Sequence, residues 1–151
     1  MQASTTPNGP LAGIRVVDLT SVVFGPYATQ IMADMGADVI KVEPPEGDNT
    51  RWISAGPEGA TGMGGVYVNV NRGKRSVMLN LREAADKAVL RKLIATADVF
   101  IHSMRGSAIG KLGFSYDAVK AIRPDIIYTN CYGYSRRGPE ADQPAYDDTI
   151  Q

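Results

Sequence analysis

The sequence predicts an α/β fold, an open and mainly parallel sheet of about five strands with flanking helices. Short β-branched runs alternate along the chain with stretches of helical periodicity, as repeated strand–helix–strand units require. About ten helical residues separate the first two runs, and a crossover of that kind favours parallel strands. Of the 151 residues, 44% are hydrophobic and 21% are charged, values typical of one globular domain.

The first half of the chain contains one strand–helix–strand unit. Residues 14–19 are rich in β-branched side chains and predict a mostly buried strand. A helix is expected next, with Pro26 in its first turn and Gly36 after its last turn. Residues 37–43 predict the second strand, which two prolines end. The glycine-rich residues 45–73 then predict a long loop or partly ordered excursion, a length that is often functional.

The second half continues the alternation. Three further strands are predicted, over residues 76–81, 98–101 and 126–130. Two helices are predicted between them, over residues 82–96 and over residues 115–122, where Ser115 is the expected N-cap. The helix over residues 82–96 is expected to face the core with the side chains that follow helical spacing. These are Ala85, Ala88, Val89, Lys92 and Leu93.

The two ends of the chain carry weaker signals. Residues 1–9 are polar and predict a flexible N-terminal tail. Residues 132–146 predict a loop, and Asp147–Gln151 predict the start of another helix. Because the chain stops within that element, we expect it to be part of a longer protein.

Composition excludes several classes of function. Sixteen basic residues balance sixteen acidic ones, so no overall field draws the chain to nucleic acid or to an anionic membrane. Cys131 and His102 are the only residues of their types, which excludes an intrachain disulfide and any zinc site built from several cysteines or histidines. No apolar run reaches the roughly 20 residues of a membrane span, and no signal peptide is visible, so the expected compartment is the cytoplasm.

Ligands of open α/β sheets bind beyond the carboxyl ends of the strands, which directs attention to five segments. These are Thr20–Pro26, Glu43–Arg51, Arg82, His102–Lys111 and Cys131–Asp147. The first has one glycine where a dinucleotide-binding turn would have three, so it is either an ordinary tight turn or a helix start that binds an anion.

Four further groups of residues are candidates for binding or catalysis. The cations within residues 71–76 would hold a phosphorylated ligand or belong to a solvated loop. Arg105 and Lys111 bracket a Gly-Ser loop that is a further candidate for binding an anion. His102 is either a hydrogen-bonded structural residue or a catalyst, and Cys131 is most simply a small buried hydrophobe.

Asp147 and Asp148 are adjacent carboxylates near the carboxyl end of the fifth predicted strand. Paired carboxylates perform acid–base chemistry when one of them has a raised pKa. Carboxylates also stabilise the first turn of a helix, and both interpretations stay open.

Several separated motifs together resemble family III CoA-transferases, the CaiB/BaiF group. The resemblance is closest over residues 10–20, 25–26 and 32–43. It continues, in order, through Gly47 and Asp48 with Arg51, residues 71–76 with Leu79, residues 97–99, residues 112–114 and residues 144–147.

The resemblance implies a Rossmann-like CoA-binding part of a large domain over residues 10–151, with a smaller domain absent from this chain. It also implies a homodimer of interlocked chains and exposed apolar surface where the absent part would pack. The family moves CoA between an acyl-CoA and a carboxylic acid through an aspartyl-CoA thioester, and the nucleophile is expected beyond residue 151. A related branch racemises 2-methylacyl-CoA, but the histidine that it needs would fall near Lys120. A non-catalytic nucleotide-binding module is the remaining alternative.

Carried over by position, the resemblance implies coenzyme A as substrate, no metal, and a set of contact residues. That set is Ser21, Val22, Phe24, Leu79, Asn80, Leu81, Arg82, Ser103, Met104, Arg105, Lys111, Tyr146 and Asp147. Asp147 matches a pocket position that is acidic in many members. Two departures are visible. Residues 102–104 replace a Glu-Asn-Phe sequence, and Lys111 replaces an arginine. A lysine holds phosphate as a point charge and lacks the planar, two-pronged donor geometry of arginine.

Overall fold

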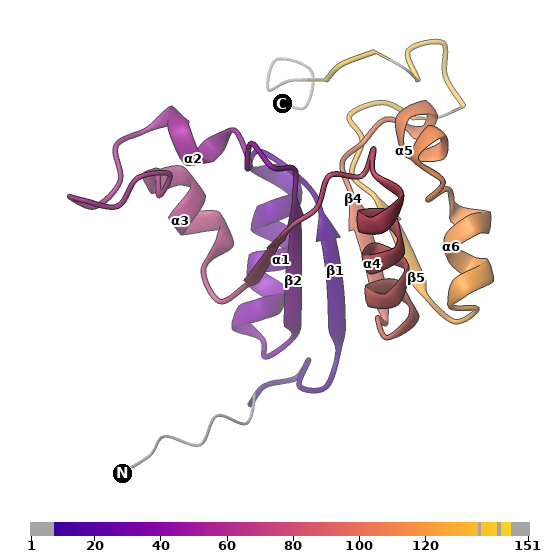
Figure 1. Cartoon of the computed structure of the whole chain (residues 1–151), viewed down its shortest axis with the longest axis horizontal. Coiled ribbons are helices and arrows are strands. Elements are labelled where there is room, and N and C mark those ends of the chain that lie inside the picture. The colour runs from indigo at the N-terminus through magenta and orange to yellow at the C-terminus, as the bar shows by residue number, and fades with distance from the viewer. Residues whose placement is uncertain (1–7, 136, 142, 146–151) are drawn as a thin grey trace.

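A five-stranded parallel sheet forms the centre of the molecule, as the sequence predicts (Figure 1). The structure is a computed structural model that describes residues 8–135, 137–141 and 143–145. The strands are β1 (Arg15–Leu19), β2 (Asp38–Glu43), β3 (Arg75–Met78), β4 (Val99–His102) and β5 (Ile127–Asn130). The helices are α1 (Phe24–Asp34), α2 (Thr50–Ile53), α3 (Gly65–Asn71), α4 (Ala84–Ala95), α5 (Gly106–Leu112) and α6 (Tyr116–Ile122).

The strand order is β3-β2-β1-β4-β5, and every neighbouring pair is parallel. This is the order of a doubly wound Rossmann sheet, in which the chain first builds outward from β1 and then crosses to its other side. The change of direction leaves β1 and β4 side by side, with Leu19 opposite His102 at their carboxyl ends. A ligand site is therefore expected where these two strands end.

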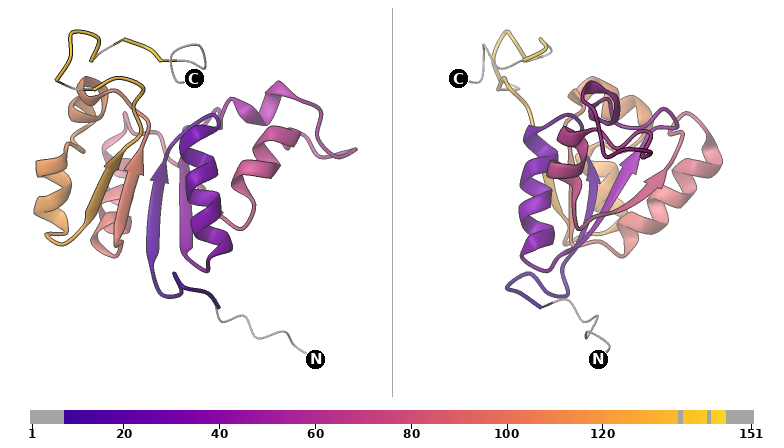
Figure 2. Two further views of the ribbon diagram at one scale, coloured as in Figure 1. Left: turned by 180° about the vertical axis from the view of Figure 1, so that it is seen from behind. Right: turned by 90° about the vertical axis from the view of Figure 1, so that its left-hand side faces the viewer.

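Helices cover both faces of the sheet (Figure 2). Val17 and Phe100 point to one face, where they pack with α4, α5 and α6. Their neighbours Val16 and Ile101 point to the other face, where they pack with α1. Because successive strand residues face opposite sides, a sheet covered on both faces requires continuous apolar runs rather than alternation. The short β-branched runs of the sequence have this origin.

Local signals predicted the ends of several elements correctly. Gly36 follows the last turn of α1 with φ of +95°, a left-handed conformation that glycine adopts without strain. Ser115 caps α6, since its Oγ accepts a hydrogen bond from the Ala118 backbone N–H at 3.4 Å. Pro26 lies in the first turn of α1 as expected.

Three segments differ from the prediction. Residues 45–73 contain α2 and α3 rather than only a loop, and α5 replaces the loop expected after β4. Both α3 and α5 are short and glycine-flanked, so their stability comes from tertiary packing through buried Tyr67 and Ile109. The third strand ends at Met78, and Leu79 to Leu81 already belong to the connection that follows.

The inward face expected for α4 is correct at Leu93, which packs against the core, and wrong at the other four positions. Leu90 and Ile94 are fully buried against the sheet, whereas Ala85, Ala88 and Val89 are exposed. The two sets have the same helical spacing, so periodicity did not distinguish them. The long side chains of Leu90 and Ile94 reach the sheet and fill the space above it, which alanine cannot do.

Helix α1 exposes apolar side chains on the side that faces away from the sheet. Val23, Tyr27, Ile31 and Met35 recur every fourth residue and are 37–54% exposed, and the neighbouring Phe24 is 64% exposed. An exposed stripe of this kind is typical of a surface that another polypeptide covers. This agrees with the apolar surface expected from the resemblance. Within the described residues, no helix is long and apolar enough to cross a membrane.

The corrected face of α4 predicts unequal costs for two neighbouring truncations. Leu90→Ala removes a fully buried side chain and should lower the free energy of unfolding by about 2–5 kcal/mol. Val89→Ala, at a 40% exposed position, should change it by no more than about 0.5 kcal/mol. Urea unfolding of both variants measures the difference. Equal losses, or a larger loss for Val89→Ala, would show that α4 is rotated relative to this structure.

Candidate functional site

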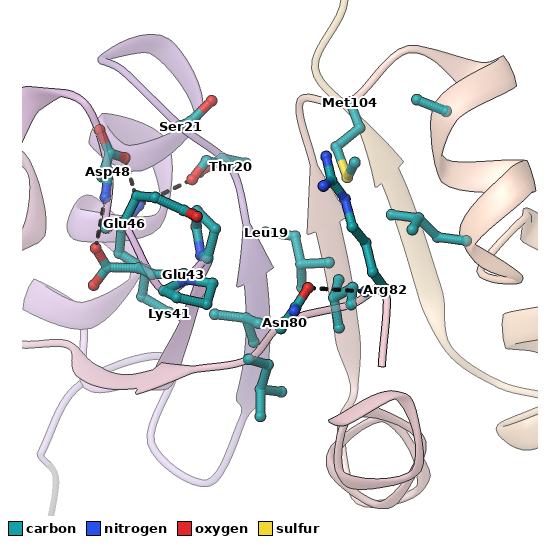
Figure 3. A pocket seen from close by; sticks show the side chains of 18 of the residues that line it. Leu19, Thr20, Ser21, Lys41, Glu43, Glu46, Asp48, Asn80, Arg82 and Met104 are labelled. Atoms are coloured by element: carbon teal, nitrogen blue, oxygen red, sulfur yellow. Dashed lines mark hydrogen bonds and ion pairs between the residues drawn. The ribbon is translucent and has the colours of Figure 1, made fainter. Parts of the chain in front are cut away.

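A pocket of about 780 Å³ opens at the carboxyl edge of the sheet, where β1, β2 and β4 end (Figure 3). This is the edge at which doubly wound sheets bind ligands. One wall is formed by the end of β1, the end of β2 and the loop of residues 44–49. The opposite wall is formed by residues 79–82, by Met104 just before α5, and by side chains of α5 itself. The residues of this second wall are Leu79, Asn80, Leu81, Arg82, Met104, Ala108, Lys111 and Leu112.

The second wall combines apolar surface with unpaired positive charge. Leu79 is buried, while Leu81, Met104 and Leu112 are partly buried and pack against the main core. Arg82 and Lys111 are exposed, and in the described part of the chain neither pairs with a carboxylate. The backbone N–H of Arg82 donates to Asn80 Oδ1 at 3.2 Å, which ties this wall together (Figure 3). Two free cations beside apolar side chains suit a ligand that is anionic at one end and apolar elsewhere.

Charges on the first wall are buried and paired. Lys41, only 1% exposed, donates to the carbonyl oxygen of Thr20 at 2.9 Å and to Asp48 Oδ2 at 3.0 Å. Asp48 Oδ1 accepts from the backbone N–H and the hydroxyl of Thr50. Burial by itself raises the pKa of Asp48, but the bonds from Thr50 and the charge of Lys41 outweigh it and lower that pKa. Asp48 is therefore a structural anion on this wall.

Glu43 is the centre of a second buried cluster. Its two carboxylate oxygens accept a bidentate pair from Arg51, with both distances 2.7 Å, and a bond from the Tyr67 hydroxyl at 2.9 Å. The Asp48 backbone N–H and the Ser76 hydroxyl also donate to it. Burial by itself raises the pKa of Glu43, but these donors outweigh it and lower the pKa to about 2.

The same cluster fixes the excursion that contains α2 and α3. The Arg51 guanidinium lies over the Tyr67 ring, with its carbon 3.8 Å from the ring centre, and Tyr67 is buried in α3. Burial and the negative charge of Glu43 raise the pKa of Tyr67 to about 12, so its hydroxyl remains a donor at neutral pH. Arg51 also donates to the carbonyl oxygen of Gly62 at 3.0 Å, which holds the segment between the two helices.

The turn between β1 and α1 is closely held. Buried Asp18 accepts from the backbone N–H and the hydroxyl of Thr20, and the Ser21 backbone N–H donates to Ser103 Oγ at 3.0 Å. Gly25 approaches Thr20 so closely that a Cβ atom there would lie 2.4 Å from the Thr20 Cβ. Val22 has φ of +69°, a conformation that a β-branched residue rarely adopts. The backbone of this turn therefore has an unusual conformation, and its neighbours pack closely around it.

The basic residues of segment 71–76 are engaged within the chain. Lys74 is buried and bonds Asp18 Oδ2 at 3.1 Å, Arg72 pairs with Asp34, and Arg75 pairs with Asp38. None of the three lines the pocket. The structure therefore favours internal ion pairs over the phosphate site considered from the sequence.

His102 has the structural role that its position suggested. It is fully buried at the end of β4, its Nδ1 accepts from the Met104 backbone N–H at 3.2 Å, and its Nε2 lies 2.9 Å from the Tyr128 hydroxyl. That hydroxyl donates onward to the carbonyl oxygen of Phe114, so Nε2 carries the proton and donates to Tyr128. Cys131 is half-buried against the α1 side of the sheet, and burial raises the pKa of its thiol.

The structure brings together most, but not all, of the contact residues expected from the resemblance. The ones that line the pocket are Ser21, Leu79, Asn80, Leu81, Arg82, Met104 and Lys111. The ones that do not line it are Val22 in the first turn, Phe24 at the start of α1, Ser103, which bonds Ser21, and Arg105, which precedes α5. Tyr146 and Asp147 lie outside the described residues, as do Asp148 and the helix expected over Asp147–Gln151.

The expected contact set omitted much of the first wall. Lys41, Glu43 and residues 44–49 all line the pocket. The sequence placed segment 43–51 near this edge, but it indicated neither Lys41 nor any residue of that segment as a ligand contact. A signal was present, because Lys41 and Glu43 interrupt the apolar residues Val39, Ile40 and Val42 of β2. A charge inside a buried strand requires a partner, and that requirement could have identified the network. No group of three or more His, Cys, Asp or Glu side chains suited to a metal gathers among the described residues.

Comparison with known proteins agrees with this geometry. Residues 11–151 match CoA-transferase family III. The chain is 42% identical over 147 residues to an acetyl-CoA:oxalate CoA-transferase of Acetobacter aceti, an alignment that covers 96% of this chain and 37% of that protein. It is 43% identical over 147 residues to a succinate–glutarate CoA-transferase of Agrobacterium fabrum, covering 94% of this chain and 37% of the relative.

A solved structure has the same fold. The crystal structure of a CaiB/BaiF family protein from Brucella suis superposes with a TM-score of 0.90 and 39% sequence identity. The superposition covers 95% of this chain and 39% of the other. The chain thus spans little more than a third of the length of these relatives.

The low pKa of Glu43 predicts that acidification lowers the free energy of unfolding. Because the folded value is about 2 and the ordinary value is 4.5, the unfolded chain takes up the proton first as the pH falls. The stabilisation from Glu43 is complete above pH 4.5 and is lost as the pH falls toward about 2. Glu43→Gln should therefore be most destabilising at neutral pH, and the difference from wild type should shrink below pH 4.5.

Urea unfolding at a series of pH values measures this difference. Glu58→Gln is the matched control, because Glu58 is exposed and forms no ion pair in the described part of the chain. Its difference from wild type should stay near zero throughout. A Glu43→Gln difference that does not change with pH would contradict the assignment.

Proposed function

The chain belongs to CoA-transferase family III, and on that premise we propose that it is the CoA-binding part of an enzyme that moves CoA between an acyl-CoA and a carboxylic acid. The relatives named above are CoA-transferases, and the chain spans about 37% of their length. The proposed CoA-binding part is Rossmann-like and covers residues 10–151, and most of the tail expected over residues 1–9 lies outside the described residues, which begin at residue 8. The whole enzyme is proposed to be a cytoplasmic homodimer.

The observation that carries the proposal is the composition of the second pocket wall. Arg82 and Lys111 offer unpaired positive charge, and the side chains between them are apolar. Coenzyme A has matching chemistry, since its nucleotide end carries phosphates and its pantetheine arm is long and uncharged. Arg82 would hold phosphate oxygens with a planar fork and Lys111 would hold them as a point charge.

The proposed orientation places the nucleotide end of CoA at the second wall and the pantetheine arm toward the first turn. Met104, Leu79 and Leu81 would contact the apolar parts of the nucleotide, and Ser21 and Val22 would contact the arm. Tyr146 and Asp147 are proposed to lie near the thioester. Ser103, Phe24 and Arg105 would complete the shell around the bound molecule.

The proposed reaction proceeds through covalent intermediates on an aspartate beyond residue 151. The aspartate carboxylate attacks the thioester carbonyl, so that a carbon–oxygen bond forms, the carbon–sulfur bond breaks, and the CoA thiolate leaves behind a mixed anhydride of the acyl group and the aspartate. The thiolate then attacks the aspartyl carbonyl of that anhydride, giving an aspartyl-CoA thioester and the free donor acid. The acceptor carboxylate repeats the two steps in reverse. Water must be excluded throughout, because it would hydrolyse the anhydride.

CoA binding to this chain is the direct test. Isothermal titration should show saturable binding of CoA, and Arg82→Ala or Lys111→Ala should weaken it roughly tenfold each, or about 1.4 kcal/mol. Lys120→Ala is the matched control, because Lys120 is an exposed lysine on α6 outside the pocket. Pantetheine lacks the phosphates, so its weaker binding should not respond to either pocket substitution.

Two outcomes would contradict the proposal. Absence of heat up to millimolar CoA would reject the binding function, and equal effects of Lys120→Ala and Lys111→Ala would reject the pocket. In a full-length relative, deuterium exchange at the α-carbon of an acyl-CoA without CoA transfer would identify a racemase instead. The isolated chain is expected to show no transferase turnover, and turnover would show that the nucleophile lies within it.

A further inference from the structure

Lys41 places a charged group inside the sheet, where an apolar side chain could be buried without the free-energy cost of removing a charge from water. It lies within β2 between buried Ile40 and Val42, and its own side chain is only 1% exposed. Removing an ammonium group from water costs free energy that an ion pair only partly recovers. A buried lysine in this strand is therefore expected to do something that an apolar side chain cannot.

The two partners of Lys41 belong to different parts of the first pocket wall. The carbonyl oxygen of Thr20 lies where β1 enters the turn, and Asp48 lies at the end of the loop that follows β2. Both residues line the pocket (Figure 3). Lys41 thus connects the turn to the loop through one ammonium group, with both distances at or below 3.0 Å.

The loop is also closed on itself. The Asp48 backbone N–H donates to Glu43 Oε2 at 3.0 Å, so the loop leaves β2 at Glu43 and returns to the same side chain. Asp48 Oδ1 in addition accepts from Thr50 at the start of α2. The position of the loop relative to the turn is consequently set by the bond between Lys41 and Asp48.

The turn on the other side needs such support. Val22 has φ of +69°, which is unfavourable for a β-branched side chain and persists only when neighbouring contacts enforce it. The two residues before Val22 are held from three elements: Asp18 in β1 and Lys41 in β2 bond Thr20, and Ser103 after β4 bonds Ser21. Of these three residues, Lys41 is the one that also bonds the loop of residues 44–49, through Asp48.

We propose that Lys41 is a positioning residue, which holds the strained Thr20–Val22 turn and the loop of residues 44–49 at the separation that admits the pantetheine arm of CoA. The proposal rests on the proposed CoA-binding function for the identity of the ligand, but its geometric part concerns the ligand-free chain. Lys41 acts in this account through Thr20 and Asp48 and not by binding the ligand, because its side chain is only 1% exposed and two of its three N–H groups bond those residues.

The test compares Lys41→Met, which keeps the length of the side chain and removes the donor, with the wild-type chain. The matched control is Arg72→Met, which removes the exposed ion pair with Asp34 and leaves the pocket untouched. In the ligand-free chain, the three-bond HN–Hα coupling and carbon shifts of Val22 report its φ. Amide hydrogen exchange of Thr20 to Val22 reports local opening.

The expected result is local. In Lys41→Met, the Val22 signals should leave the left-handed region, and exchange of the turn amides should rise at least tenfold more than exchange of the core amides of Val16 and Phe100. Uniform acceleration of all these amides, with Val22 unchanged, would mean that Lys41 contributes only to stability and would overturn the proposal. Arg72→Met should change neither observable.

A milder variant covers the case in which Lys41→Met does not fold. Asp48→Asn keeps the shape of the side chain and weakens its bond to Lys41, so it should shift the 44–49 loop signals while leaving Val22 closer to its wild-type state. A variant in which neither segment changes would overturn the proposed connection.

Titration with CoA separates the two proposals. If wild type binds CoA, Lys41→Met should raise the dissociation constant at least tenfold, and Arg72→Met should not. The tenfold loss should appear equally with pantetheine, because the defect lies on the arm and not at the phosphates. If wild type binds no CoA, the proposed function fails, whereas the Val22 and exchange measurements still decide whether Lys41 positions the turn.

Discussion

Three carboxylates are buried beneath the carboxyl edge of the sheet, and the need to neutralise them shapes the molecule around them. Asp18 and Glu43 are at most 2% exposed and Asp48 is 4% exposed. A buried charge without a partner costs several kcal/mol, more than most single contacts contribute. Each carboxylate therefore requires a cation: Lys41 pairs with Asp48, Arg51 pairs with Glu43, and Lys74 pairs with Asp18 across a long separation in sequence.

This requirement explains why residues 44–74 fold back onto the sheet although their sequence has little regular pattern. Arg51 ties α2 to Glu43 and stacks on Tyr67 of α3, and Lys74 ties the chain before β3 to Asp18. The excursion is therefore held by a few charge-assisted bonds in place of a large apolar core. Acidification acts on the same bonds, since the pKa values of Glu43 and Asp48 are both lowered.

The same neutralisation also determines which charges remain available to a ligand. Most cations near the carboxyl edge on the β2 side are engaged internally, whereas Arg82 and Lys111 across the pocket are not. An anionic ligand would be attracted to that second wall, and its uncharged part would extend along the first. On the proposed function, a wall of internally paired charges facing an open, cationic wall would orient an asymmetric ligand without a glycine-rich phosphate-binding turn.

The sequence by itself determined the five parallel strands in their succession along the chain, the cap at Ser115, the helix end at Gly36 and the family resemblance. Each of these depends on local pattern: apolar runs that must be buried on both faces, or a residue with an unusual backbone preference. Only the tertiary structure decided that Leu90 rather than Val89 faces the sheet, that α3 and α5 are helices, and that Lys41, Glu43 and Asp48 form one network. The reason is physical: a buried contact is specified by both partners together, and residues as far apart as Asp18 and Lys74 carry no trace of each other in a local pattern.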